Sequence, residues 1–144
     1  MGFSTSAATA IIFTGVIVMI GMTAGVVFET YGDLKDAALE ASDAEYDRQR
    51  TRVSMVNSSY NSTHVFINAT NTGEVNIDAG YLDVLLNGTL ETERIEIVTV
   101  EGTSSKVWGI HETLYLEVAY GGANNATRIR LITHNGVSGT KVMV

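Results

Sequence analysis

The sequence contains no cysteine and no proline among its 144 residues. Without cysteine there can be no disulfide scaffold, no thiolate metal site and no thiol nucleophile. The compartment stays open, because an extracellular domain can do without disulfides. Without proline, the turns of the chain must be made by glycine, asparagine and aspartate.

Charged side chains are absent from residues 1–28, and the first is Glu29. About 26 apolar residues at ~1.5 Å each exceed the ~30 Å hydrocarbon core of a bilayer, so the segment predicts a transmembrane helix in contact with lipid. A cleaved secretory signal fits poorly, because no basic residue precedes Ala7 and the apolar run is too long. The opening residues 1–6 also fit a myristoylation pattern, but a lipid anchor would be redundant beside a spanning helix.

Two glycines within the apolar run, Gly21 and Gly25, are separated by three residues. In membrane helices this spacing lets a second helix approach closely, where lipid supplies no hydrophobic drive for association. Gly21 and Gly25 are therefore candidate helix-packing residues. Through them the chain is expected to form a homo-oligomer.

Basic residues are scarce, and the net charge is −7. Residues 29–52 hold seven acids and four bases, and residues 53–144 hold nine acids and five bases. No basic patch is available to neutralise a phosphate backbone, which argues against nucleic-acid binding.

Good helix formers continue beyond the apolar run, from Glu29 to about Gln49. Their apolar stripe is thin, which indicates either a solvated stalk or a helix that pairs with a partner stalk. After Thr51 the composition changes to β-branched and aromatic residues. The predicted organisation is a transmembrane helix over residues 1–28, an acidic helical stalk over 29–51 and a β-domain over 52–144.

The β-domain contains short runs with alternating apolar and polar residues, separated by glycine- and asparagine-rich clusters. Seven such runs in about 90 residues are typical of an antiparallel β-sandwich of immunoglobulin-like type. The predicted fold class is α+β, a long N-terminal helix followed by this sandwich. The predicted strands are Arg52–Val56, His64–Asn68, Tyr81–Leu86, Arg94–Val100, Leu114–Tyr120, Arg128–Thr133 and Lys141–Val144.

Asn-x-Ser/Thr sequences occur five times in the β-domain, and four of them lie at or near turn clusters where a glycan could project. They support a domain outside the cytoplasm. The candidate N-glycosylation sites are Asn57, Asn61, Asn68, Asn87 and Asn125.

Catalytic chemistry has no candidate residues in this sequence. His64, His111 and His134 are far apart and lack the spacing of a metal pair or of a nucleophile and its base. Asp78 and Asp83 do not begin a calcium loop. We expect no enzyme activity, no metal and no cofactor.

The only tryptophan, Trp108, lies in the connection between Ser104 and Thr113. Two interpretations remain open. A half-exposed indole could anchor a partner protein, or the ring could pack across the open end of the sandwich.

An apolar N-terminal helix, an acidic stalk and one small all-β domain form the plan of type IV pilin-like proteins. Within that superfamily the opening, residues 1–13, resembles the archaeal ArlF (FlaF) family of archaellum accessory proteins. Asn71–Gly73, leading into Leu82–Gly88, is similar to a strand-turn-strand sequence shared by ArlF, ArlG and archaellins. The resemblance covers the whole chain in order.

This resemblance implies a pilin-like protein anchored in the cytoplasmic membrane, with its β-domain outside the cytoplasm beneath the surface layer. There the domain would bind surface-layer protein and act with an ArlG-like archaellum subunit as a stator, the static part of the rotary motor. Neither role requires an enzyme.

Filament assembly is the alternative that the resemblance leaves open. An ArlG-like or archaellin-like subunit would polymerise through residues 3–49 and expose its sandwich as the outer sheath. A pilin-type precursor would carry a charged leader ending in glycine, whereas only Met1 and Gly2 precede Phe3. This favours an uncleaved accessory protein. A membrane-tethered enzyme or ligand-binding domain is a third class, for which the sequence has no candidate residues.

Overall fold

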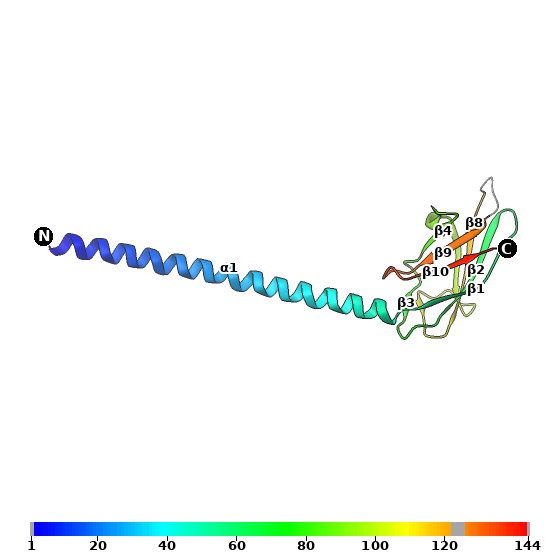
Figure 1. The fold of residues 1–144 in the computed structure, drawn as a ribbon, viewed down its shortest axis with the longest axis horizontal. Coiled ribbons are helices and arrows are strands. Elements are labelled where there is room, and N and C mark those ends of the chain that lie inside the picture. Colours follow the sequence, from blue (N-terminus) through cyan, green and yellow to red (C-terminus); the bar gives the residue numbers. More distant parts are fainter. Residues whose placement is uncertain (1, 122–125, 144) are drawn as a thin grey trace. The chain divides into compact units, whose positions relative to one another are not determined.

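The computed structural model describes residues 2–121 and 126–143, and it divides into two compact units, Met1–Asp43 and Ala44–Val144. The first unit consists of a single helix, α1, which begins at Gly2 and continues to Arg50 inside the second unit (Figure 1). An 18-residue window of α1 has a mean hydropathy of 2.4, and none of its residues is buried. By length and composition α1 is thus a candidate membrane-spanning helix.

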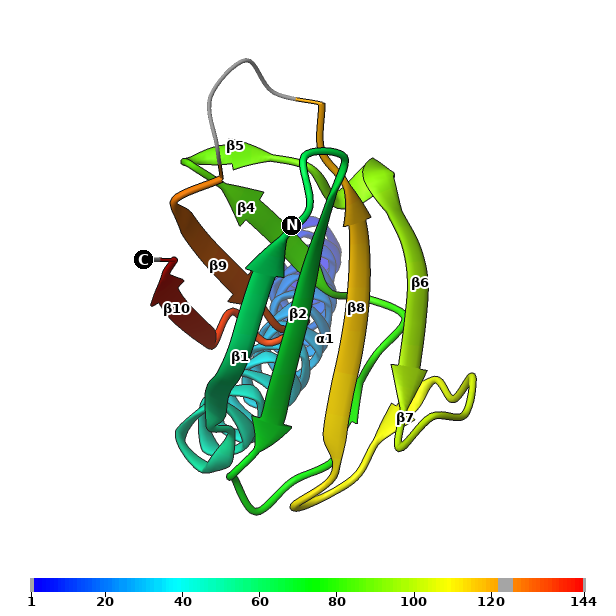
Figure 2. The ribbon, with the colours of Figure 1, turned by 90° about the vertical axis from the view of Figure 1, so that its right-hand side faces the viewer.

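The second unit contains two four-stranded antiparallel sheets that lie one behind the other (Figure 2). The first sheet has the order β1-β2-β8-β6, with bounds Val53–Tyr60, His64–Asn71, Thr113–Ala119 and Ile95–Val100. The second has the order β10-β9-β4-β5, with bounds Ser138–Val142, Arg128–Ile132, Asp83–Leu86 and Thr89–Leu90. A separate ribbon pairs β3 (Ile77–Asp78) with β7 (Val107–Trp108), and a short 3-10 helix, η1, spans Thr92–Arg94.

The strand order is that of an immunoglobulin fold. When β3 and β7 are set aside, the first sheet reads A-B-E-D and the second G-F-C-C′ in immunoglobulin notation. The sequence predicted this α+β class and the immunoglobulin-like sandwich, and the structure confirms both. Each of the seven predicted strands is present, although several bounds move by a few residues.

Alternation along the strands explains why the two sheets pack face to face. In β2 and β8 every second residue is buried, so one face of each strand enters the core and the other faces solvent. The core is contiguous and drawn from both sheets. Its fully buried aliphatic residues are Val65, Ile67, Ala69, Val84, Leu86, Leu114, Leu116, Val118, Ile129 and Leu131.

The two edges of the sandwich differ in how they are covered. On one side β1 lies against β10, where Lys141 Nζ donates to the Val56 carbonyl at 2.6 Å. On the other side β6 pairs only with β8 in the described part of the chain. A groove of about 310 Å³ follows this edge and is lined by Leu82, Ile95, Val98 and Lys106, among others. Within the described residues, the edge of β6 is therefore an exposed strand edge with no strand beside it.

Candidate functional site

The C-terminal end of α1 is enclosed by two loops of the sandwich. We call this region the helix junction and define it as residues 46–52, loop 71–75 and turn 133–137. A helix end leaves carbonyl groups without partners inside the helix. Here the Glu74 N–H donates to the Arg50 carbonyl at 2.9 Å, and Thr51 donates to the Asp47 carbonyl through both N–H (3.0 Å) and Oγ1 (2.8 Å).

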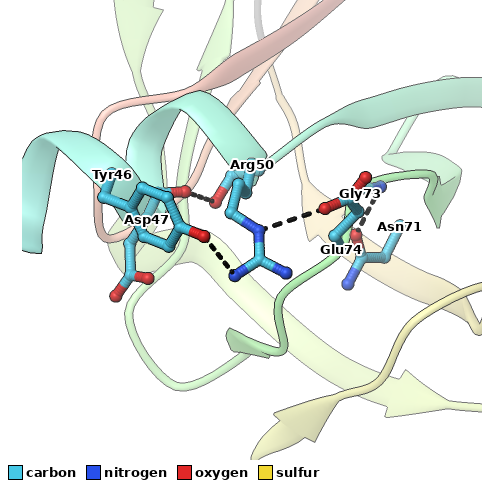
Figure 3. Close-up of polar contacts among 7 residues, drawn as sticks. Tyr46, Asp47, Arg50, Asn71, Gly73 and Glu74 are labelled. Carbon is cyan, nitrogen blue, oxygen red and sulfur yellow. Dashed lines mark hydrogen bonds and ion pairs between the residues drawn. The ribbon is translucent and has the colours of Figure 1, made fainter.

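The Arg50 side chain lies between Tyr46 and Glu74 (Figure 3). Its Nε donates to Glu74 Oε2 at 3.1 Å, and its guanidinium carbon is 5.0 Å from the centre of the Tyr46 ring. The hydrogen bond to Glu74 is the main cause that raises the pKa of Arg50. Both side chains reach solvent, so this pair is screened by salt and orients the loop more than it stabilises the domain.

Asn71 gives loop 71–75 its shape. Its side chain is fully buried, and Nδ2 donates to the carbonyls of Val75 at 2.8 Å and Trp108 at 3.3 Å. Oδ1 accepts from the Gly73 N–H at 3.0 Å, as Figure 3 shows. The carboxamide thus satisfies three backbone groups that would otherwise be buried without partners.

Gly73 lies where loop 71–75 touches the end of the helix. A Cβ atom added at Gly73 would overlap the Arg50 carbonyl oxygen and would lie 2.6 Å from the Arg52 nitrogen. Both are backbone atoms and cannot rotate away. The close approach of the loop to the helix end therefore requires glycine at this position.

Turn 133–137 holds the other side of the helix end. Asn135 Nδ2 donates to Thr51 Oγ1 at 2.6 Å, and Thr133 Oγ1 donates to Asn135 Oδ1 at 2.6 Å. Thr51 and Thr133 are both buried. Two loops distant in sequence thus fix one helix end, which makes the junction a firm mechanical connection within the second unit.

The chemistry of the junction is that of a structural joint. The described residues contain no group of three or more His, Asp or Glu side chains placed to hold a metal ion. What the arrangement can do is transmit force between the end of α1 and the sandwich.

The glycines predicted to mediate helix packing lie on an open helix surface. Both Gly21 and Gly25 are exposed, and a Cβ atom at either would have no described atom within 4 Å. Because Gly21 and Gly25 carry no side chains, a second helix has room to approach this surface. Pairing through this surface stays a prediction.

The candidate glycosylation sites differ in their surroundings. Asn57 and Asn61 are exposed, and Asn61 Oδ1 accepts from the Thr63 and His64 N–H groups in the β1–β2 turn. Asn68 is half-buried on β2. Asn125 lies outside the described residues.

Asn87 has a structural role that competes with glycosylation. Asn87 and Gly88 form the two-residue turn between β4 and β5. Both have positive φ values, 54° and 92°, as a type I′ hairpin turn requires. Asn87 Oδ1 accepts from the N–H groups of Thr127 at 2.9 Å and Arg128 at 3.0 Å, and Nδ2 donates to the Tyr120 hydroxyl at 3.3 Å. A glycan on Nδ2 would leave one N–H there, and that N–H would have to keep the contact with the Tyr120 hydroxyl.

Trp108 is not a surface anchor, which corrects one of the two sequence-based interpretations. The side chain is fully buried, because β7 pairs with β3 and turns the ring into the core. Its Nε1 donates to the Glu112 carbonyl at 2.8 Å. Packing at the end of the sandwich is therefore the role of Trp108.

Sequence reasoning missed most of the helix junction. Asn71–Gly73 was noticed only as part of a strand-turn-strand sequence, and Arg50 was not singled out at all. The contacts of the junction join residues 24 and 84 positions apart, which no local pattern reveals.

No protein-family model and no curated protein sequence matches this chain. Among solved structures, one similar chain is the archaellum periplasmic stator protein FlaG from Sulfolobus acidocaldarius. The two are 16% identical with a TM-score of 0.47, and the match covers 65% of this chain and 99% of that chain.

Proposed function

We propose that this chain is a non-catalytic, single-pass membrane anchor of the archaellum motor, a stator whose sandwich lies outside the cytoplasm and binds the surface layer. One observation carries the proposal. An apolar helix long enough to cross a bilayer continues unbroken to Arg50, where loops of an immunoglobulin-like sandwich fix its end. The chain has one part suited to lipid, one suited to protein, and a firm joint at the helix end.

The resemblance to the ArlF family supplies the identity of the partners. In this proposal the helix is held by lipid of the cytoplasmic membrane, and the sandwich binds surface-layer protein and an ArlG-like subunit. A rotating filament needs a part that stays fixed against the cell envelope. Two attachment regions on one chain meet this need without catalysis.

The exposed edge of β6 is the part of the sandwich we expect surface-layer protein to contact. A strand edge offers unpaired N–H and C=O groups to a strand of another protein. Next to these groups, Ile97 is 42% exposed. The groove combines apolar residues such as Ile95 and Val98 with polar ones such as Ser105 and Lys106. The opposite edge is covered, because β1 lies against β10.

Replacing Ile97 with lysine is expected to weaken binding to surface-layer protein about tenfold, because a charge at the edge opposes strand addition. The measurement is size-exclusion chromatography with light scattering on residues 44–144, alone and mixed with surface-layer protein at two salt concentrations. Val142→Lys is the matched control, since Val142 is 60% exposed on the covered side. If both variants lose binding to surface-layer protein equally, or if neither loses it, the β6 edge is excluded as the contact.

A filament subunit is the second candidate function, favoured by the exposure of the whole apolar window of α1. Polymerisation would bury that window against copies of itself. Electron microscopy of the full-length chain separates the two functions. Discrete particles that bind surface-layer protein support the anchor, whereas extended fibres without such binding support the filament subunit.

A further inference from the structure

The outward face of the first sheet carries a pair of aromatic rings beside a glycosylation sequence. Phe66, Asn68 and Thr70 alternate with buried residues on β2, so all three point away from the core. Tyr115 on β8 is the register partner of Asn68. The rings of Phe66 and Tyr115 stack with centres 6.4 Å apart and planes 21° apart.

Asn68 itself has a carboxamide without a hydrogen bond to any residue that the structure describes. This separates it from Asn87, whose amide holds the β4–β5 turn, and from Asn61, whose oxygen caps the β1–β2 turn. Asn57 is the register partner of Asn68 on β1, and its Oδ1 accepts from the Ser58 N–H at 2.9 Å. Because the bonds at Asn57 and Asn61 are made by Oδ1 and leave Nδ2 available, the feature that distinguishes Asn68 is an aromatic ring on its own strand, Phe66, and another on the neighbouring strand, Tyr115.

Glycan chemistry suits this surface. The flat face of a pyranose ring presents C–H groups that pack on the face of an aromatic ring, and aromatic rings gain most by covering apolar area. Phe66 precedes Asn68 by two residues and Tyr115 lies across from it, so the first sugar on Nδ2 would meet both rings. Burial, and to a smaller degree the Glu117 carboxylate, raises the pKa of Tyr115.

We propose that Asn68 is an N-glycosylation site and that the first sugars of its glycan cover the Phe66–Tyr115 ring pair. The donor is a saccharide linked to a lipid phosphate. Asn68 Nδ2 forms the bond to the anomeric carbon and loses one proton, while the bond from that carbon to the phosphate oxygen breaks and the lipid phosphate leaves. Thr70 supplies the hydroxyl that completes the acceptor sequence. The inference rests on the proposed function in one respect, the position of the sandwich outside the cytoplasm.

The consequence is a division of the sandwich surface. A glycan at Asn68 makes the outward face of the first sheet bulky and hydrophilic. Protein partners are then directed to the edge of β6. Asn57, beside Asn68 on the neighbouring strand, would be shielded by the same glycan.

Mass spectrometry of peptides tests the site. The full-length chain is produced in an archaeal host that glycosylates its envelope proteins, and the occupancy of each sequon is measured. We expect a glycan on the Asn68 peptide that disappears in Asn68→Gln. Occupied sequons elsewhere with Asn68 bare would overturn this inference and leave the location of the sandwich intact.

Limited proteolysis of spheroplasts separates this inference from the proposed function. If every sequon is bare but added protease cleaves the sandwich, the glycan inference alone fails. If every sequon is bare and the sandwich is protected from protease, the glycan inference fails, and so does the placement of the sandwich outside the cytoplasm.

A thermal double-mutant cycle tests the contact with the rings. Phe66→Thr, Asn68→Gln and the double variant are compared for full-length protein from the archaeal host and from a non-glycosylating bacterium. In protein from the archaeal host, the midpoint shift of the double variant should differ from the sum of the two single shifts by about 3 °C. In protein from the bacterium, the shifts should simply add. Equal coupling in both hosts would show that the sugar does not contact the rings.

Discussion

Replacing Gly73 with alanine is expected to lower the free energy of unfolding of residues 44–144 by about 3 kcal/mol. The added methyl group would overlap the Arg50 carbonyl oxygen and press on the Arg52 nitrogen, and neither backbone atom can move without opening the junction. The loop would withdraw, and the Arg50 carbonyl would lose its bond from the Glu74 N–H. Urea unfolding followed by circular dichroism measures this loss.

Gly121→Ala is the control for that experiment. A Cβ atom at Gly121 has no described atom within 4 Å, so the same chemical change should leave the unfolding midpoint unaltered. Hydrogen exchange adds a local readout, because Glu74 and Thr51 amides should exchange faster in Gly73→Ala. A variant that keeps wild-type stability and slow exchange at these amides would show that the loop does not press on the helix end.

Much of the fold followed from local patterns in the sequence. Alternation over residues 94–100 and 128–133 predicted strands, and the structure places β6 and β9 there. The uncharged run to Phe28 predicted a helix, and α1 covers it. These predictions succeed because burial of one strand face imposes a period of two on the residues of a strand, and because a long uncharged apolar run without proline favours a helix.

Features that depend on distant contacts could not be predicted in this way. The two-residue strands β3, β5 and β7 are too short to show a period. The position of Trp108 depends on the pairing of Ile77 with Trp108, which the sequence does not encode locally. The junction depends in the same way on Asn135 reaching Thr51.

The junction also explains why the last turns of α1 group with the sandwich instead of with the apolar helix. Their carbonyl groups are satisfied by Thr51 and by the Glu74 N–H, and Thr51 is held in turn by Asn135. A helix end left to solvent would fray, because its last carbonyls would have only water as partners. In the stator that we propose, a frayed helix end would act as a hinge between the helix and its domain.

Replacing Asn71 with aspartate is expected to cost about 3–5 kcal/mol of unfolding free energy at pH 7, although the two side chains have the same shape. In the variant a carboxylate oxygen takes the place of Nδ2 and faces the carbonyl oxygens of Val75 and Trp108. Two hydrogen bonds become repulsive contacts around a buried charge. Urea unfolding of residues 44–144 measures the loss, with Asn76→Asp as the control at an exposed asparagine.

The loss caused by Asn71→Asp should shrink as the pH falls. The unfolded chain has an aspartate pKa of about 3.9, and burial beside two carbonyls raises the pKa of this carboxyl in the folded state. Between the unfolded-state pKa and the folded-state pKa, the folded variant binds more protons than the unfolded variant. The stability of the variant therefore rises relative to wild type as the pH decreases from 7 towards 4. Below both values the protonated carboxyl donates one hydrogen bond and restores part of the contact. The variant and wild type could instead differ in unfolding free energy by the same amount at pH 7 and at pH 4. The carboxylate would then have left the buried site. In that case Asn71 would not be the residue that holds the loop closing the helix junction.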